Sequence, residues 1–160
     1  MTTDPALSGN RKRQMKSAAR LYAVQALFQM EHSGQTSDAV REEFVDFRFG
    51  AEVDEGVDMA EGDVDLFRKL LDDAVSWQAK IDQMTDRALV AKWPIGRIDP
   101  TLRALFRAAG AELVQSDTPP KVVIMEYVDV AKAFYPTGKE SKFVNAVLDH
   151  MAHEARPEAF

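Results

Sequence analysis

The segment DPTLRALFRAAGAEL, from Asp99 to Leu113, is the most informative part of the sequence for the fold. Asp99 is a favourable helix N-cap, and Pro100 suits the first helical position, where no amide donor is lost. The apolar residues that follow recur with a helical period: Leu102, Leu105, Phe106, Ala109 and Leu113. The segment therefore predicts an amphipathic helix with one face directed towards a core.

Helical periodicity continues on both sides of this segment. Upstream, it predicts helices over residues 11–31, 36–47, 63–75 and 81–92, with a break near Lys80. The pair Trp93-Pro94 ends the last of them, because a residue before proline avoids the helical region. Downstream, the pattern predicts helices over residues 118–136 and 139–151. Seven helices with short connections predict an all-α fold, a single compact bundle in two helical subdomains.

A block of acidic residues interrupts the helical pattern. Ten carboxylates lie between Glu42 and Asp65, against one cation, Arg48. Residues 50–62 also lack aromatic side chains, so this stretch is predicted to be a mobile acidic loop. The predicted domain therefore spans residues 11–154, with a flexible N-terminal tail at 1–10 and a C-terminal tail at 155–160.

Composition and motifs exclude several classes of function. The absence of cysteine excludes disulfides, cysteine-ligated zinc and a thiol nucleophile. No apolar run approaches the roughly 20 residues of a membrane span, and no secretory signal precedes the first helix, which predicts a soluble cytoplasmic protein. His150 and His153 share a helix face but lack a third ligand at motif spacing. No phosphate-binding or nucleophile motif occurs, so neither an enzyme, a cofactor nor a metal is predicted.

The charge is unevenly distributed along the chain. The net charge is −6, yet the first twenty residues carry five cations against one acid. Arg13, Lys16 and Arg20 are spaced to form one basic stripe on a helix, preceded by Arg11 and Lys12. Such a stripe can neutralise the phosphates of a nucleic acid. The alternatives are a solvated tail and an arm that docks on an acidic protein.

Three aromatic residues are candidates for stacking on unpaired RNA bases. Tyr22 lies on the apolar stripe of its helix, which favours a place in the core. For Phe28 and Phe143 the spacing alone leaves core packing and base stacking equally open, since Leu27 and Val144 can serve the core instead.

Three segments, in order, resemble the NusB family of transcription antitermination factors. They are ARLYAVQALFQME (19–31), RIDPTLRALFRAAGAEL (97–113) and TPPKVVIMEYVDVAKAFYPTGKESKFVNAVLDHMA (118–152). The resemblance implies an all-helical protein that binds the boxA element of ribosomal RNA operon leader transcripts. It also implies a heterodimer with NusE, a small-subunit ribosomal protein. That heterodimer joins other Nus factors on RNA polymerase and suppresses premature termination, without catalysis or cofactor.

The resemblance also assigns RNA-contacting positions. The basic positions of the family's N-terminus fall on Lys12, Lys16 and Arg20, and an aromatic position falls on Phe28. The KFVN element supplies Lys142 and Phe143, whereas Arg11 and Arg13 are added on charge alone. Ser17 and Ala18 stand where the family is often basic, which implies weak RNA affinity without the partner. Exposed aromatic or methionine positions would leave self-association into a homodimer open.

Overall fold

The computed structural model describes residues 9–49, 62–89 and 95–160, and its regular structure there is entirely helical. The helices are α1 (Gly9–Ser33), α2 (Ser37–Phe44), α3 (Val64–Ser76), α4 (Gln78–Ala88), α5 (Pro100–Gln115), α6 (Pro120–Phe134) and α7 (Lys139–Ala155). A π-helical turn, η1 (Val45–Phe49), continues α2, and short 3-10 turns lie at η3 (Ile95–Arg97) and η4 (Pro157–Ala159). The predicted all-α fold with about seven helices is confirmed.

Side-chain caps place the starts of several helices. Asp99 accepts a hydrogen bond from the amide of Thr101 at 2.8 Å, and Asp63 accepts one from the amide of Leu66 at 2.9 Å. Thr36 accepts one from the amide of Ala39 at 3.1 Å. Each cap satisfies a backbone donor that the first helical turn would leave without a partner. The cap signals at Thr36, Asp63 and Asp99 therefore mark true helix starts, whereas α6 follows Pro119 without a side-chain cap.

The break between α3 and α4 lies at Trp77, three residues before the predicted position at Lys80. Trp77 leaves helical geometry with φ −110° and ψ 15°. Its amide still donates to the carbonyl of Asp73, and its own carbonyl accepts from Ile81, both at 2.9 Å. The chain therefore bends here with its neighbouring backbone hydrogen bonds retained, which an apolar period cannot reveal.

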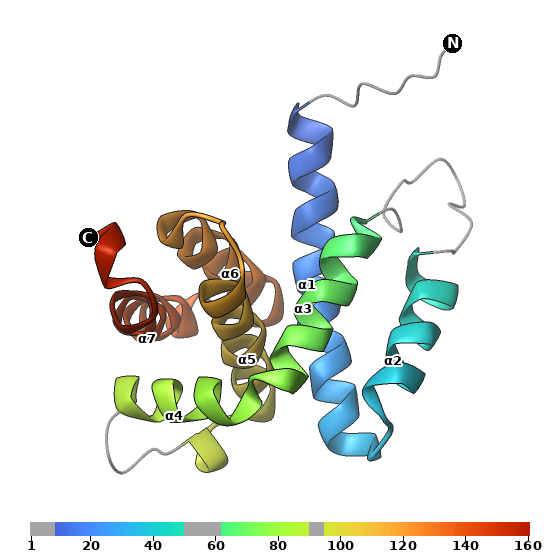
Figure 1. Cartoon of the computed structure of the whole chain (residues 1–160), viewed down its shortest axis with the longest axis horizontal. Coiled ribbons are helices and arrows are strands. Elements are labelled where there is room, and N and C mark those ends of the chain that lie inside the picture. Colours follow the sequence, from blue (N-terminus) through green and yellow to red (C-terminus); the bar gives the residue numbers. More distant parts are fainter. Residues whose placement is uncertain (1–8, 50–61, 90–94) are drawn as a thin grey trace.

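Helix α5 holds the two halves of the molecule together. It packs against α1 and α3 on one side and against α4, α6 and α7 on the other (Figure 1). Its alanines and Gly110 are buried among larger side chains such as Phe106 and Leu113. Small residues let neighbouring helices approach closely, so the two predicted helical subdomains share one core. None of the described helices is long and apolar enough to cross a bilayer.

We expect Asp99→Ala to lower the free energy of unfolding by about 1 kcal/mol, because α5 loses its N-cap. The carboxylate also accepts a hydrogen bond from the hydroxyl of Tyr135 at 2.7 Å. Urea unfolding at pH 7 measures the change. Asp117→Ala, at an exposed residue just beyond the same helix, is the matched control. Equal losses in the two variants would contradict a capping role.

Candidate nucleic-acid interface

Three of the predicted cations lie exposed on the N-terminal half of α1. They are Lys12, Arg13 and Lys16, whereas Arg11 is half-buried. Arg13 makes a long hydrogen bond to the side chain of Asn10, at 3.4 Å, which leaves most of the guanidinium facing solvent. Together these exposed cations form a short basic surface on the N-terminal half of α1; this half is the upper end of the helix in Figure 1.

The start of α3 lies directly beside this basic surface. The amide of Asp63 donates to the carbonyl of Met15 at 3.0 Å and fixes the chain against α1. A cavity of about 400 Å³ between the two segments is lined by Lys12 and Lys16 on one side and by Asp63 and Asp65 on the other. The two carboxylates lower the local positive potential that a polyanion would meet.

Arg20 does not belong to the exposed surface, so the predicted stripe through Arg13, Lys16 and Arg20 is wrong at its third member. Arg20 is only 4% exposed. Its Nε and Nη2 atoms donate to the two carboxylate oxygens of Glu112 on α5, at 2.9 and 2.6 Å. A bidentate, buried ion pair of this kind is not available to an RNA phosphate. The spacing along one helix could not reveal a partner 92 residues away.

The ion pair is the centre of a larger polar cluster between α1, α5 and α6. The hydroxyl of buried Tyr127 donates to Glu112 at 3.0 Å, and Glu126 lies 3.2 Å from the Arg20 guanidinium. Ser17 donates to Glu126 at 2.7 Å. Burial, and then the charge of Glu112, raise the pKa of Tyr127. Burial alone would lower the pKa of Arg20, but the hydrogen bond and charge of Glu112 outweigh it and raise that pKa.

Phe28 lies on the same helix, about 18 Å beyond Lys16 by the helical rise. Its ring is 36% exposed and stacks on His32, with the ring centroids 4.1 Å apart. Both side chains line a groove of about 540 Å³. Tyr22, by contrast, is partly buried against the core, as predicted. Its ring packs edge-on against that of Phe44.

Lys142 and Phe143 lie in the first turns of α7. Lys142 is exposed, and the Phe143 ring is 38% exposed over the buried ring of Phe106, with 6.1 Å between centroids. Phe134, at the end of α6, lines the groove with Phe28, and the turn after it leads into α7. Phe28 therefore lies beside the end of α6, about 18 Å along α1 from the exposed Lys16.

Comparison with known proteins places this arrangement in a family. The NusB family model matches residues 17–153. The chain belongs to the NusB family. It is 46% identical to the transcription antitermination protein NusB of Maricaulis maris, over 96% of this chain and 94% of the relative. It is 48% identical to that of Caulobacter vibrioides, over 94% and 99%.

Solved NusB structures share the fold. A crystal structure of the antitermination factors NusB and NusE in complex with dsRNA matches with a TM-score of 0.70 and 25% identity, covering 90% of this chain and 98% of that one. T. maritima NusB matches with a TM-score of 0.69 and 28% identity, covering 90% and 95%. The family resemblance of the sequence is thus confirmed. The family consists of non-catalytic antitermination factors, in agreement with the prediction that this chain is not an enzyme.

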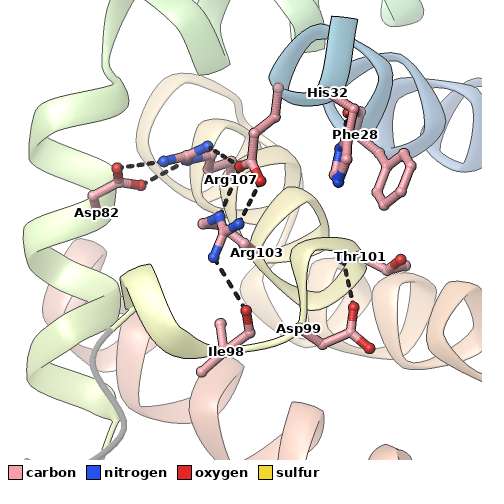
Figure 2. A network of polar contacts seen from close by, with 9 residues as sticks. Phe28, His32, Asp82, Ile98, Asp99, Thr101, Arg103 and Arg107 are labelled. Carbon is pink, nitrogen blue, oxygen red and sulfur yellow. Dashed lines mark hydrogen bonds and ion pairs between the residues drawn. The ribbon is translucent and has the colours of Figure 1, made fainter.

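A second polar cluster in this NusB-family chain was not predicted from the sequence. Figure 2 shows Arg103 and Arg107 of α5 reaching towards the end of α1 and towards α4. Glu31 accepts from Arg103 Nε at 2.7 Å and from Arg107 Nη1 at 3.2 Å. Arg107 also forms a bidentate pair with Asp82, at 3.0 and 2.9 Å. The cluster therefore links α1, α4 and α5 next to Phe28 and His32.

Acid should weaken this cluster. The hydrogen bond from Arg103, followed by the charges of Arg103 and Arg107, lowers the pKa of Glu31 although partial burial opposes the shift. A depressed carboxyl pKa contributes stability that is present above the unfolded-state pKa and is lost as pH falls through the folded-state value. We expect Glu31→Gln to lose less than about 1 kcal/mol at pH 7, since the site is partly exposed. Urea unfolding from pH 7 down to pH 3 should show this loss shrinking; an equal loss throughout would contradict the linkage.

The remaining predictions fall partly outside the described residues. Residues 1–8 and most of the predicted acidic loop, 50–61, lie there. The domain boundaries stay predictions, although α1 begins at Gly9 and α7 ends at Ala155. Within the described parts of the chain, no cluster of three or more potential metal ligands occurs. His153 instead stacks on Phe160, with centroids 3.6 Å apart.

Proposed function

We propose that this chain binds boxA-containing RNA of ribosomal RNA operon leader transcripts together with NusE, and thereby helps RNA polymerase resist premature termination. The observation that carries the proposal is the exposed basic surface of Lys12, Arg13 and Lys16 in a chain that belongs to the NusB family. The fold match to a NusB–NusE complex with dsRNA supports it.

Two kinds of RNA contact are expected: cations that bind phosphates and aromatic rings that stack on bases. The cations of α1 neutralise phosphates and release counterions, which supplies affinity without reading sequence. Phe28 and Phe143 each offer a partly exposed ring supported from behind by another ring, His32 or Phe106. Such rings stack on unpaired bases. Arg20, assigned to RNA by resemblance, instead holds the N-terminal half of α1 against α5.

NusE raises the RNA affinity of the chain in this proposal. Only a short basic surface is exposed, and Asp63 and Asp65 lie beside it, so RNA affinity of the chain alone is expected to be low. In this proposal NusE contacts the same RNA and so adds to the affinity. In this scheme the pair acts on nascent transcripts in the cytoplasm, together with other Nus factors and RNA polymerase. Self-association into a homodimer is a separate prediction, which sedimentation of the purified chain tests.

The deciding experiment compares a boxA RNA with a scrambled RNA, with and without NusE, across a salt series. We expect binding that prefers boxA, tightens with NusE and weakens with salt. Equal binding of both RNAs, unchanged by NusE, would overturn the proposal and favour a basic arm that docks on an acidic protein. Charge reversal at Arg13 and Lys16 distinguishes that alternative, because it would then abolish protein binding and leave RNA binding at background.

The double variant Lys12→Ala/Lys16→Ala should bind boxA RNA about tenfold or more weakly. The salt dependence should also become shallower: the negative slope of log K against log salt should shrink in magnitude by about 1.4, since each single-strand phosphate contact contributes about 0.7. Fluorescence anisotropy measures both the affinity and the salt slope, across about 50–300 mM KCl, a range that includes physiological ionic strength. The matched control is Lys121→Ala/Lys132→Ala, which removes two exposed lysines from α6. A slope that falls equally in both variants would contradict a localised basic surface.

A further inference from the structure

A second groove, with an apolar centre, opens where α6 and α7 lie side by side (Figure 1). It has a volume of about 400 Å³. Ile124, Met125 and Val128 form its centre, and the Met125 side chain is 55% exposed. None of its lining residues belongs to the basic surface of α1 or to the groove beside Phe28. This surface is therefore not accounted for by the RNA contacts proposed above.

The residues of α6 along this groove repeat with the period of a helix–helix contact. Met125, Val128 and Lys132 follow Lys121 at intervals of 4, 7 and 11 residues. Residues at these intervals share one side of a helix, so the four side chains form a straight stripe about 16 Å long. A stripe of this kind packs well against another helix. Its methionine and both lysines nevertheless remain exposed.

A lysine stands at each end of the stripe. Lys121 is exposed, and the Nζ atom of Lys132 lies 4.0 Å from Asp129. The side chains of that pair are 60% and 65% exposed, and an ion pair so open to solvent is weak. Both ammonium groups are therefore available to carboxylates of a partner, and about three helical turns separate them.

We propose that this groove binds an amphipathic helix of another protein, one with an apolar centre and a carboxylate near each end. The apolar side chains of that helix cover Met125 and Val128, and its two carboxylates pair with Lys121 and Lys132. Anchors at such intervals are typical of helices that bind in a groove. The inference goes beyond the RNA-binding proposal and does not depend on it.

Charge argues against a second copy of this chain as the occupant. In a symmetric pair of α6 helices, an antiparallel arrangement sets Lys121 of each copy against Lys132 of the other. A parallel arrangement sets each lysine against its own counterpart. Both arrangements bring like charges together, which is unfavourable at an interface.

RNA also fits this groove poorly. Its lining contains no aromatic side chain on which a base could stack. The carboxylate of Asp129 would repel a phosphate, and the apolar centre offers a phosphate no hydrogen-bond donor. The lining thus favours a protein helix, and RNA becomes an outcome of the test.

The first test is a titration with two synthetic helical peptides of about 20 residues. The acidic peptide has two glutamates spaced like Lys121 and Lys132, and two leucines spaced like Met125 and Val128. The second peptide has lysines in place of the glutamates. NMR follows the methyl group of Met125, with that of Met151, which is fully buried, as a reference. We expect the acidic peptide to shift the Met125 signal at concentrations about tenfold lower than the lysine peptide. Equal responses to the two peptides, or no response, would overturn the proposal.

The second test exchanges the charges of the groove. Lys121→Glu/Lys132→Glu should bind the acidic peptide about tenfold more weakly than the unmodified protein does, and should bind the lysine peptide more tightly. Both side chains are exposed, so the fold should be retained, and urea unfolding checks this. Weaker binding of both peptides by a folded variant would contradict recognition by charge.

The third test removes the apolar centre without adding a charge. Met125→Gln should bind the acidic peptide about fivefold more weakly. Ala133→Gln changes an exposed residue of the same helix outside the groove, and should bind the peptide like the unmodified protein. Equal binding by the two variants would contradict docking over Met125.

Binding of RNA and of NusE by the same variants separates this inference from the proposed function. We expect Met125→Gln to bind boxA RNA and NusE like the unmodified protein. If it binds either of them more weakly, the groove belongs to the RNA-binding assembly, and the proposal of a separate docking site is wrong. Failure of the boxA experiment would leave the peptide titration decisive for the groove.

Discussion

Replacing Arg20 with methionine should lower the free energy of unfolding by about 3–5 kcal/mol, the usual cost of breaking a buried ion pair. The variant would leave Glu112, which is 1% exposed, without its bidentate partner. The hydroxyl of Tyr127 alone cannot compensate for a buried carboxylate charge. Urea unfolding followed by circular dichroism measures the loss. Lys16→Met, one turn earlier and exposed, is the control and should change stability by no more than about 0.5 kcal/mol.

A double variant separates loss of the pair from loss of packing. Arg20→Met/Glu112→Leu removes both charges, and apolar replacement of a whole buried ion pair is often neutral or stabilising. It should therefore recover a large part of the stability lost in Arg20→Met. Losses that simply add would show that the two side chains contribute independently and that the ion pair is not what holds α1 against α5.

The Arg20 pair also shows where prediction from the sequence reaches its limit. Helix starts at Asp63 and Asp99 could be predicted, because a cap and its first turn are neighbours in the chain. The burial of Arg20 could not, because its partner is carried by another helix. One signal was available: Glu112 interrupts the apolar end of α5, between Ala111 and Leu113, and a carboxylate in such a place requires a cation.

The candidate site was predictable to a similar degree. Charge counting along the chain located the exposed surface of Lys12 and Lys16 without any structure. The exposure of Phe28 and Phe143 depends on tertiary neighbours, so the apolar period alone left both residues undecided. The groove beside Phe28 is assembled from four segments that are distant in sequence, and no pattern within any one of them indicates it.

Gly110→Ala should destabilise the protein by about 1–3 kcal/mol, although alanine is the better helix former. A Cβ atom built on Gly110 would lie 2.4 Å from Cγ2 of Ile81, well inside contact distance. Ile81 is fully buried on α4, and a β-branched side chain has few other rotamers in a helix. The two helices would have to separate, which weakens the junction between α4 and α5. Gly96→Ala is the control, because nothing lies within 4 Å of its added Cβ.

A substitution at Ile81 should relieve this clash. In Ile81→Ala, the methyl group that meets the new Cβ is gone, and a cavity remains in its place. Adding Gly110→Ala to that background should therefore cost much less than it does alone, because the new methyl enters the space that isoleucine vacated. Thermal and urea unfolding of the four proteins give the coupling energy. If Gly110→Ala stabilises the protein by up to about 1 kcal/mol, as helix propensity alone predicts, then close contact between α4 and α5 does not explain the glycine.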